Sequence, residues 1–319
     1  MADVSVIICS HNPTPSQLGR VLAALETQTL PRCDWELLLV DNASAEPLAA
    51  RWPLPWHPRA RHVRENRLGL TPARLRGIRD ASGDLLVYVD DDNVLAPDYL
   101  RNARDLVATH PHLGAIGAGV LAPEFAVEPP RELVPHLGLL ALREASGPLW
   151  SNNPRDLGCV PWGAGLCVSR QVAQEYERLV AQLGMDEVLD RHGEHLFGAG
   201  DVAFSWSAVL GGQGFGVFPT LCVTHLIRAE RLTRRYFLQL VHDRSFSAGV
   251  LNFLRTGTPP GDGYGAAERV LRLALRGIRK GPFAMRMGWA ATRGADRARA
   301  FIAAQHLRQV LPRPAPAVS

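Results

Sequence analysis

The sequence predicts an α/β protein with a Rossmann-like, mostly parallel sheet, helices on its faces and a helical extension at its C-terminus. Short apolar runs typical of buried strands alternate with segments of helical spacing. Polar clusters at 10–12, 41–44, 66–74 and 90–93 follow predicted strands or the loops after them. Because ligands of parallel sheets bind at the carboxyl ends of the strands, we expect these clusters to meet along one edge.

The first third of the chain supplies three predicted strands. Val4–Cys9 and Trp35–Val40 are apolar runs, and Arg61–Arg64 is expected to be a shorter strand. Ser16 could cap a helix between the first two runs, where apolar residues stand three and four positions apart. Thr71 followed by proline predicts the start of another helix, since proline suits the first helical position.

The fourth predicted strand, Leu85–Val89, ends in three consecutive carboxylates, Asp90, Asp91 and Asp92. Like charges this close repel one another unless a cation lies between them. Oxygen ligands suit a hard divalent ion such as Mg²⁺ or Mn²⁺. The alternative is a solvated acidic turn before the next helix, and the polar clusters around the strand favour the metal site.

The middle of the chain continues the alternation less regularly. Tyr99–Thr109 is expected to be a helix and Ala115–Leu121 a strand, whereas the proline-rich residues 123–157 are expected to be loop. Small residues within 160–168 precede another strand and would let the backbone approach a ligand closely. Trp162 in that segment is either an exposed ring on which an acceptor substrate could stack or a residue of the core.

The last part of the predicted sheet and the helices after it complete the expected core. Val202–Leu210 should be a helix, and Val217–Thr224 a strand interrupted by Pro219, with His225 at its end. A long helix should begin near Arg231 and run toward Val250.

The chain divides into four predicted segments. Residues 1–255 form the predicted catalytic domain, 256–265 a Gly/Pro linker, 266–311 a basic amphipathic helical extension and 312–319 a disordered tail. Such an extension can pack on the core, form a dimer interface or lie on an anionic membrane.

The positive charge belongs to the extension. The chain has a formal net charge of +4, but residues 266–308 hold ten Lys/Arg against two acids, so this stretch carries +8 and the remainder −4. A nucleic-acid partner is not expected, because the body of the protein lacks a basic excess.

The sequence predicts a cytoplasmic protein, with contact at the inner face of the membrane through 266–311 as an option. The first residues have neither a basic segment nor an apolar one typical of a signal peptide. No apolar run reaches the length needed to span a bilayer. The five cysteines form no CxxC pair, as expected for buried thiols in a reducing compartment.

Four motifs in order carry a resemblance to a known family. They are Val-Ile-Ile-Cys-Ser-His-Asn at 6–12, Glu-Leu-Leu-Leu-Val-Asp-Asn-Ala-Ser at 36–44, the Asn66–Arg74 region, and the run 81–92 that ends in the three aspartates. Their order and spacing resemble family 2 glycosyltransferases, which are inverting enzymes with the GT-A fold. A dinucleotide-binding domain is disfavoured, because the first strand is not followed by GxGxxG.

The resemblance implies a site that binds a nucleotide sugar and a divalent ion. Donor-contacting residues by this likeness are Ser10, His11, Asn12, Asp41, Asn66, Arg74, Asp90 and Asp91. The implied ligands for Mg²⁺ or Mn²⁺ are Asp92, Asp90 and His225, although a histidine at a strand end is often structural.

The implied general base is Asp201, at the start of the predicted helix 202–210. Aspartate at such a place is also an ordinary helix cap. The family commonly has a Glu-Asp pair here, whereas this chain has Gly200 before Asp201, so Glu194 is the fallback base.

The function these expectations imply is metal-dependent, inverting transfer of one sugar from a nucleoside-diphosphate sugar to a hydroxyl acceptor. The resemblance favours uridine as the nucleoside, and the acceptor could be a glycan or a lipid-linked molecule. Two alternatives stay open: a sugar nucleotidyltransferase, and a non-catalytic module that binds a nucleotide sugar.

Overall fold

The computed structural model describes residues 3–183, 200–261, 266–305 and 307, which divide into two compact units. The first contains the described parts of Met1–Glu128, His136–Gly193 and Gly200–Ala229. The second contains Pro129–Pro135 and the described residues after Ala229. The second unit thus begins before the linker predicted at 256–265. The functional boundaries that we expect at 255 and 265 remain a prediction.

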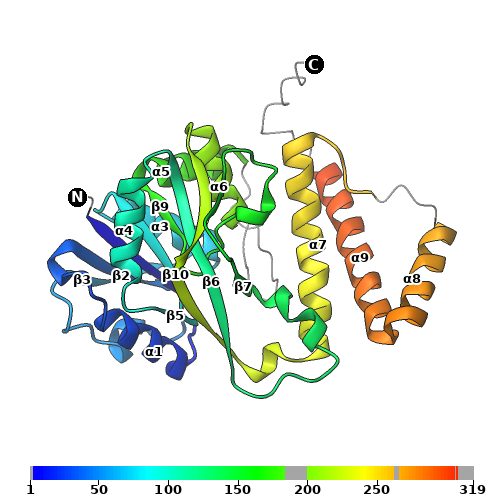
Figure 1. The fold of residues 1–319 in the computed structure, drawn as a ribbon, viewed down its shortest axis with the longest axis horizontal. Helices are drawn as coiled ribbons and strands as arrows, with labels where there is room; N and C mark the ends of the chain where they lie inside the picture. The colour runs from blue at the N-terminus through cyan, green and yellow to red at the C-terminus, as the bar shows by residue number, and fades with distance from the viewer. Residues whose placement is uncertain (1–2, 184–199, 262–265, 306, 308–319) are drawn as a thin grey trace. The chain divides into compact units, whose positions relative to one another are not determined.

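The first unit is built on a parallel core of four strands. In the order of the sheet these are β3 (Ala60–Glu65), β2 (Trp35–Asn42), β1 (Val4–Ser10) and β4 (Leu85–Asp90), the first two of which are labelled in Figure 1. Every neighbouring pair among them is parallel. The alternation of apolar runs and helical segments therefore predicted the centre of the fold correctly.

The rest of the sheet is mixed. Strand β9 (Cys167–Ser169) is antiparallel to β4 and to β6 (Leu113–Phe125), and β6 is parallel to β10 (Gly214–Ile227). The short strand β5 (Asn93–Leu95) pairs antiparallel with β10. Two further short strands, β7 (Arg143–Glu144) and β8 (Leu149–Ser151), pair with β6 and β10.

Two expectations about this part of the sheet were wrong. Strand β10 continues to Ile227, so His225 lies within the strand and not at its end. A register shift between Phe218 and Cys222 accommodates Pro219, which has no N–H to donate to a neighbouring strand. Residues 123–157 are not loop throughout, because β7, β8 and a 3₁₀ helix (Val134–Leu140) form there.

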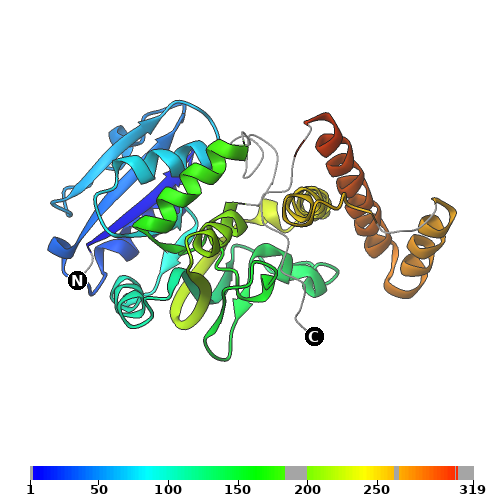
Figure 2. The same cartoon turned by 90° about the horizontal axis from the view of Figure 1, so that it is seen from above.

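Helices cover both faces of the sheet (Figure 2). One face carries α1 (Pro15–Glu26) and α4 (Tyr99–Thr109), whose apolar side chains form one core with Val6 and Ile8 of β1. Ile7, between them, points to the other face and reaches α3 (Leu70–Asp80) at Gly77. This alternation follows from the two-residue period of a strand.

The second face also carries α5 (Arg170–Leu183) and α6 (Gly200–Leu210). Tyr176 of α5 stacks on Phe204 of α6 at 3.8 Å between ring centroids, and Phe204 lies 5.2 Å from the ring of Tyr88 in β4. These three rings anchor both helices against the sheet, which positions the first turn of α6.

The starts of two helices differ from expectation by one to two residues. Helix α1 begins at Pro15 after Thr14, so Ser16 is not its cap. Helix α3 begins at Leu70 after Gly69, which puts Thr71 in the first turn. Gly69 has a φ of 135°, a conformation that favours glycine. A short helix, α2 (Leu48–Arg51), follows β2.

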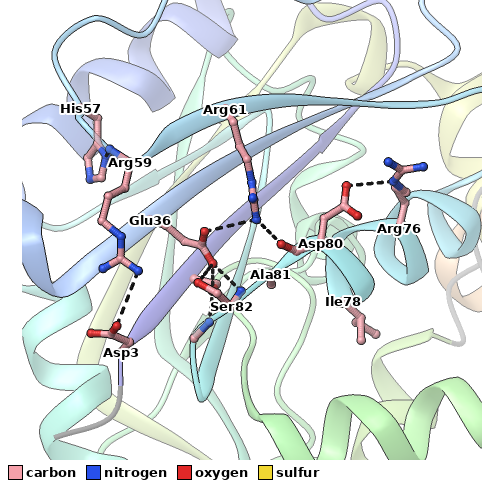
Figure 3. Close-up of polar contacts among 12 residues, drawn as sticks. Asp3, Glu36, His57, Arg59, Arg61, Arg76, Ile78, Asp80, Ala81 and Ser82 are labelled. Atoms are coloured by element: carbon pink, nitrogen blue, oxygen red, sulfur yellow. Dashed lines mark hydrogen bonds and ion pairs between the residues drawn. The ribbon is translucent and has the colours of Figure 1, made fainter.

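A buried carboxylate, that of Glu36, ties the amino ends of the strands together, and Figure 3 shows its contacts with Arg61 and Ser82. Glu36 of β2 accepts hydrogen bonds from the hydroxyl of Ser5, at 2.6 Å, and from the backbone amide and hydroxyl of Ser82. The guanidinium of Arg61 in β3 lies 3.3 Å from it. Burial raises the pKa of Glu36, but these donors outweigh burial and the net pKa is lowered.

The second unit consists mainly of α7 (Arg234–Thr256), α8 (Ala266–Lys280) and α9 (Pro282–Ala304). Small residues allow α7 and α9 to pack closely, since a Cβ at Gly249 would lie 2.9 Å from that of Ala298. The rings of Phe246 and Phe301 meet at 5.5 Å beside them. Helix α7 ends at Gly257, whose φ is 72°.

Among the residues that the structure describes, no helix is both long enough and apolar enough to cross a bilayer.

Candidate functional site

The carboxyl ends of β1, β2 and β4 meet at one edge of the sheet. Ser10 of β1 is paired with Asp41 of β2, and Cys9 with Asp90 of β4. The Ser10 hydroxyl donates to a carboxylate oxygen of Asp91 over 2.5 Å. The polar residues after different strands therefore contact one another, as the sequence predicted.

The loop after β1 is fastened to the loop after β2. His11 Nδ1 lies 2.7 Å from the carbonyl oxygen of Asn42; because that oxygen can only accept, Nδ1 carries the proton in this contact. His11 Nε2 can then accept from the amide of Asn12, 2.9 Å away. Asn12, whose φ is 45°, donates its backbone N–H to the Ser44 hydroxyl and accepts from the backbone of Ala45.

Asp41 is 4% exposed and organises the turn after β2. Its two oxygens accept from the backbone amides of Ser44 and Leu48, and Arg64 Nη1 lies 2.6 Å from Oδ2. Burial acts to raise the pKa of Asp41, but these hydrogen bonds prevail and the pKa is lowered. The carboxylate is therefore held ionised at the edge of the sheet. Its predicted contact with a nucleoside stays a prediction.

Asn42 holds the loop that precedes α3. Its side chain donates to the carbonyl of Arg67 over 2.6 Å and accepts from the amide of Gly69 over 2.8 Å. Asn66, in this loop, is exposed and accepts from Arg64 Nε at 3.2 Å. The cluster at 66–74 thus joins the same edge, with Asn66 open to solvent.

The acidic cluster after β4 separates into different environments. Asp91 turns toward Ser10, whereas Asp92 turns toward β10, where its Oδ2 lies 3.5 Å from Nε2 of His225. Antiparallel pairing of β5 with β10 places Asn93 opposite His225 and so sets this approach. Asp90 is half-buried at the end of β4. Asp92 and His225 are thus brought together by two strands distant in sequence.

The donor set around Asp92 fits a divalent ion in part. A carboxylate oxygen and an imidazole nitrogen are both ligands that Mn²⁺ accepts, and Asn93 adds a buried amide oxygen, Oδ1, that no hydrogen-bond donor in the described part of the chain reaches. Within residues 3–183, 200–261 and 266–305, however, no three His, Cys, Asp or Glu side chains are grouped as ligands. The structure therefore offers two ligands with an amide oxygen nearby, and Asp90 as a third ligand stays a prediction.

Asp201 and Arg74 form an ion pair across the second face of the sheet. Asp201 lies in the first turn of α6 with its side chain 26% exposed, and Arg74 of α3 is buried, with Nη2 3.3 Å from Oδ1 of Asp201. The Arg74 guanidinium also lies 5.9 Å from the ring centroids of Tyr88 and Phe204. An adjacent cation favours the ionised carboxylate, which is the form that accepts a proton.

Gly163 lies directly against this ion pair. A Cβ built on it would be 2.5 Å from Arg74 Nη2 and 3.0 Å from Asp201 Oδ1. Its neighbour Gly165 has a φ of 77° and accepts a hydrogen bond from the Tyr99 hydroxyl. The small residues in 160–168 therefore permit a close approach of backbone to side chains of the site; an approach to a ligand stays a prediction.

Arg143 is a residue of this region that no pattern in the sequence indicated. Its guanidinium stacks on the ring of Trp162 at 3.9 Å and donates to the carbonyl of Val160 over 2.9 Å. Burial lowers the pKa of Arg143, while Cys159 and then Asp201 act in the opposite direction. Arg143 therefore fixes the segment that carries Gly163 and adds positive charge near Asp201.

Other residues of the edge were not predicted, or lie outside the described part of the chain. Ser44 and Asn93 are buried polar residues that belong to the clusters at 41–44 and 90–93, but neither was assigned a role from the sequence. Glu194, the fallback base, lies in 184–199, outside the described residues.

The arrangement combines three chemical capacities. The edge offers hydroxyl, amide and carboxylate groups suited to the hydroxyls of a sugar and the polar atoms of a base, the Asp92–His225 pair suits a divalent ion, and Asp201 offers a partly exposed carboxylate. The predicted residues thus fall in two connected places: most are at the strand ends, and Arg74 and Asp201 are at the junction of α3 and α6.

Comparisons with known proteins agree with this arrangement. Residues 5–139 match the family described as glycosyl transferase family 2. The succinoglycan biosynthesis protein ExoW of Rhizobium meliloti is 32% identical to this chain over 108 residues. The matched stretch covers 32% of this chain and 33% of ExoW. YwdF of Bacillus subtilis, named as an uncharacterized glycosyltransferase, is 27% identical to this chain over 106 residues. The matched stretch covers 33% of this chain and 38% of YwdF. The chain thus matches about a third of these relatives' length.

A solved structure resembles the whole fold. A mannosyltransferase from Pyrobaculum calidifontis, in complex with GDP-Man and Mn²⁺, superposes with a TM-score of 0.53 at 20% identity, covering 95% of this chain and 75% of that one. This likeness concerns the fold alone. The family match spans β1 to β6, the part of the chain that supplies the polar edge. Residues 5–139 thus resemble glycosyl transferase family 2, and the fold of the chain is of the GT-A type.

Proposed function

We propose that this protein is a metal-dependent, inverting glycosyltransferase that moves one sugar from a nucleoside-diphosphate sugar to a hydroxyl acceptor. The observation that carries the proposal is the Arg74–Asp201 ion pair, which sets a partly exposed carboxylate beside a family 2 domain whose strand ends are lined with polar groups. A glycan or a lipid-linked molecule is the proposed kind of acceptor.

The donor binds at the carboxyl ends of the parallel strands. Ser10, Asn12 and Asp41 contact the base and ribose, and Arg74 contacts the diphosphate, which requires its buried guanidinium to become accessible when the donor binds. Side chains assigned to the rest of the donor are His11, Asn66, Asp90 and Asp91. The contacts among Ser10, Asp91, His11 and Asn42 support this assignment, because they hold the loops in place before a ligand arrives.

Asp92 and His225 would hold the divalent ion together with the donor phosphates, and Asp90 is the proposed third protein ligand. A site with few protein ligands is typical of ions that also bind substrate phosphates. When bound, the ion offsets the negative charge that gathers on the departing diphosphate.

Asp201 is the proposed general base. It takes the proton from the acceptor hydroxyl while that oxygen attacks the anomeric carbon on the face opposite the leaving diphosphate, so the new bond inverts the configuration. Arg74 lies beside the Asp201 carboxylate, and Gly163 leaves the space that their contact needs. Gly200, where the family commonly has Glu, leaves Asp201 as the acid of this turn.

Ligand binding and turnover test separate parts of the proposal. Thermal shift with UDP, GDP and ADP, with and without Mn²⁺, should give the largest stabilisation for one diphosphate with Mn²⁺, and UDP is the first expectation. Incubation with matching sugar donors should release the nucleoside diphosphate. Release of pyrophosphate would instead identify a nucleotidyltransferase, and binding without turnover a non-catalytic module.

Two substitutions locate the chemistry. Asp201→Asn should lower turnover by about 10²–10⁴-fold while nucleotide stabilisation persists, because only the base is lost. Asp92→Ala should abolish the Mn²⁺-dependent part of the shift. Asp105→Asn, an exposed carboxylate of α4, is the control. Turnover like that of the unmodified protein in either site variant would contradict the assignment.

A further inference from the structure

Helix α8 has an apolar face that its own unit leaves uncovered. Leu271, Leu275 and Ile278 are 59%, 41% and 82% exposed, and their spacing of four and three residues puts them on one side of the helix. Three large apolar side chains aligned and exposed in this way differ from singly scattered surface residues and mark an interaction surface.

The side of α8 that packs on its neighbour is a different one. Leu273 is 8% exposed, and a Cβ at Gly277, four residues on, would lie 3.1 Å from the sulfur of Met285 in α9. At 100° per residue this packed side is well separated from the stripe through Leu275. The exposed stripe is therefore not the core-facing side of a surface helix.

Arginines lie along one flank of the exposed apolar stripe of α8. Arg272 and Arg279 are both exposed and directly follow Leu271 and Ile278 in sequence. Arg272 is paired with Glu268 at 3.1 Å, the one acid in the sequence of α8. Around its axis α8 thus presents a packed side, an apolar side and a basic side.

We propose that this face of α8 docks on an anionic membrane surface. A helix with an apolar side next to a Lys/Arg-rich side lies in the interface plane, with its apolar residues among the acyl chains and its cations at anionic headgroups. Charge complementarity favours this occupant over a second copy of the chain. Two copies joined antiparallel through the stripe would bring the arginines of one copy against those of the other, and like charges in an interface cost binding energy.

Vesicle flotation of the full-length chain tests the proposal without reference to sugar transfer. The protein should float with vesicles that mix phosphatidylcholine and phosphatidylglycerol, bind pure phosphatidylcholine far less, and lose binding as salt is raised. Leu271→Gln combined with Ile278→Gln should lower the partition by at least about tenfold, because two apolar side chains no longer enter the bilayer.

Matched variants separate the two contributions. Arg272→Gln with Arg279→Gln should remove the preference for anionic vesicles, whereas Arg178→Gln with Arg101→Gln, exposed arginines of the first unit, should retain it. Val127→Gln with Leu157→Gln controls for exposed apolar side chains elsewhere. Circular dichroism should show unchanged helix content in every variant.

Three results would overturn the proposal. Equal binding to neutral and anionic vesicles would remove the electrostatic basis. Equal losses in the site and control variants would remove the role of α8. If the chain binds no vesicles and sedimentation gives a dimer that Leu271→Gln with Ile278→Gln converts to monomer, a second copy covers the stripe instead.

Discussion

Gly163 illustrates how the absence of a side chain organises this site. The buried guanidinium of Arg74 and the carboxylate of Asp201 reach each other only because no Cβ stands between them and the backbone at 163. Arg143 restrains the same segment from behind by stacking on Trp162. Close packing of this kind transmits small displacements directly to the carboxylate.

Gly163→Ala should therefore impair transfer while leaving the fold intact. The added methyl group would push Arg74 or Asp201 by several tenths of an ångström or more, and misplacement of a reacting group by about 1 Å costs on the order of 10²-fold in rate. Steady-state rates and the thermal midpoint should be measured together.

Gly158→Ala is the matched control, because nothing lies within 4 Å of a Cβ at that position. Equal turnover for the two alanine variants would mean that the spacing around Arg74 and Asp201 does not limit the reaction.

At the scale of the element, β2 carries a buried carboxylate near each end, and the two have different surroundings. Asp41, near the carboxyl end, is held by backbone amides and Arg64 among the polar loops of the site. Glu36, near the amino end, joins β1, β3 and the turn after α3 (Figure 3). Both have lowered pKa values, but only one end of a parallel sheet gathers ligands.

Glu36→Gln should destabilise the protein without affecting nucleotide binding. The amide nitrogen of Gln would face donors that the carboxylate now accepts from, so the free energy of unfolding at pH 7 should fall by about 1–3 kcal/mol. Urea unfolding of both proteins provides the comparison. Glu124→Gln, which disrupts a surface ion pair with Arg20, should cost less.

The pH dependence of this difference has a definite sign. Because the folded pKa of Glu36 is lowered, its stabilisation is complete above the ordinary glutamate value of about 4.3 and is lost as pH falls through the folded pKa. The two proteins should therefore converge in stability in strong acid. A constant difference down to pH values below the folded pKa would show that the charge of Glu36 is not its source.

At the scale of the molecule, mild acid should act on the first unit through a buried histidine. His57 is 3% exposed between Trp35 and Trp56, with its ring centroid 4.1 Å from that of Trp35. Burial, assisted by the charges of Arg32 and Arg59, lowers its pKa from 6.5 to about 4. The folded protein thus keeps this imidazole neutral at pH values where the unfolded chain binds a proton.

Stability should consequently decrease between pH 6.5 and about pH 4, by up to about 3 kcal/mol from this residue. His57→Phe removes the titrating group while keeping a ring between the tryptophans, so its unfolding free energy should depend less on pH over this interval. Urea unfolding at several pH values measures both slopes. Identical slopes would exclude His57 as the origin of the loss.

The sequence alone determined the parallel core and its functional edge. The apolar runs at 4–9, 35–40 and 85–89 indicate strands that are buried on both faces of the sheet. Because these strands are parallel, the polar residues that follow them lie at the same edge of the sheet. Helix α5, whose buried residues Val172, Tyr176 and Leu179 recur at helical spacing, could have been predicted in the same way but was not.

Only the tertiary structure decided which distant side chains meet. Arg74 and Asp201 are 127 residues apart, and Asp92 reaches His225 because β5 pairs with β10, a crossover that no local pattern encodes. The spacing of apolar residues along the sequence indicates which residues are buried. It does not indicate which residue a buried polar group contacts, because that depends on how strands and helices are arranged in the fold. For that reason the sequence could propose candidate residues for this site, whereas the fold determined which of them contact one another.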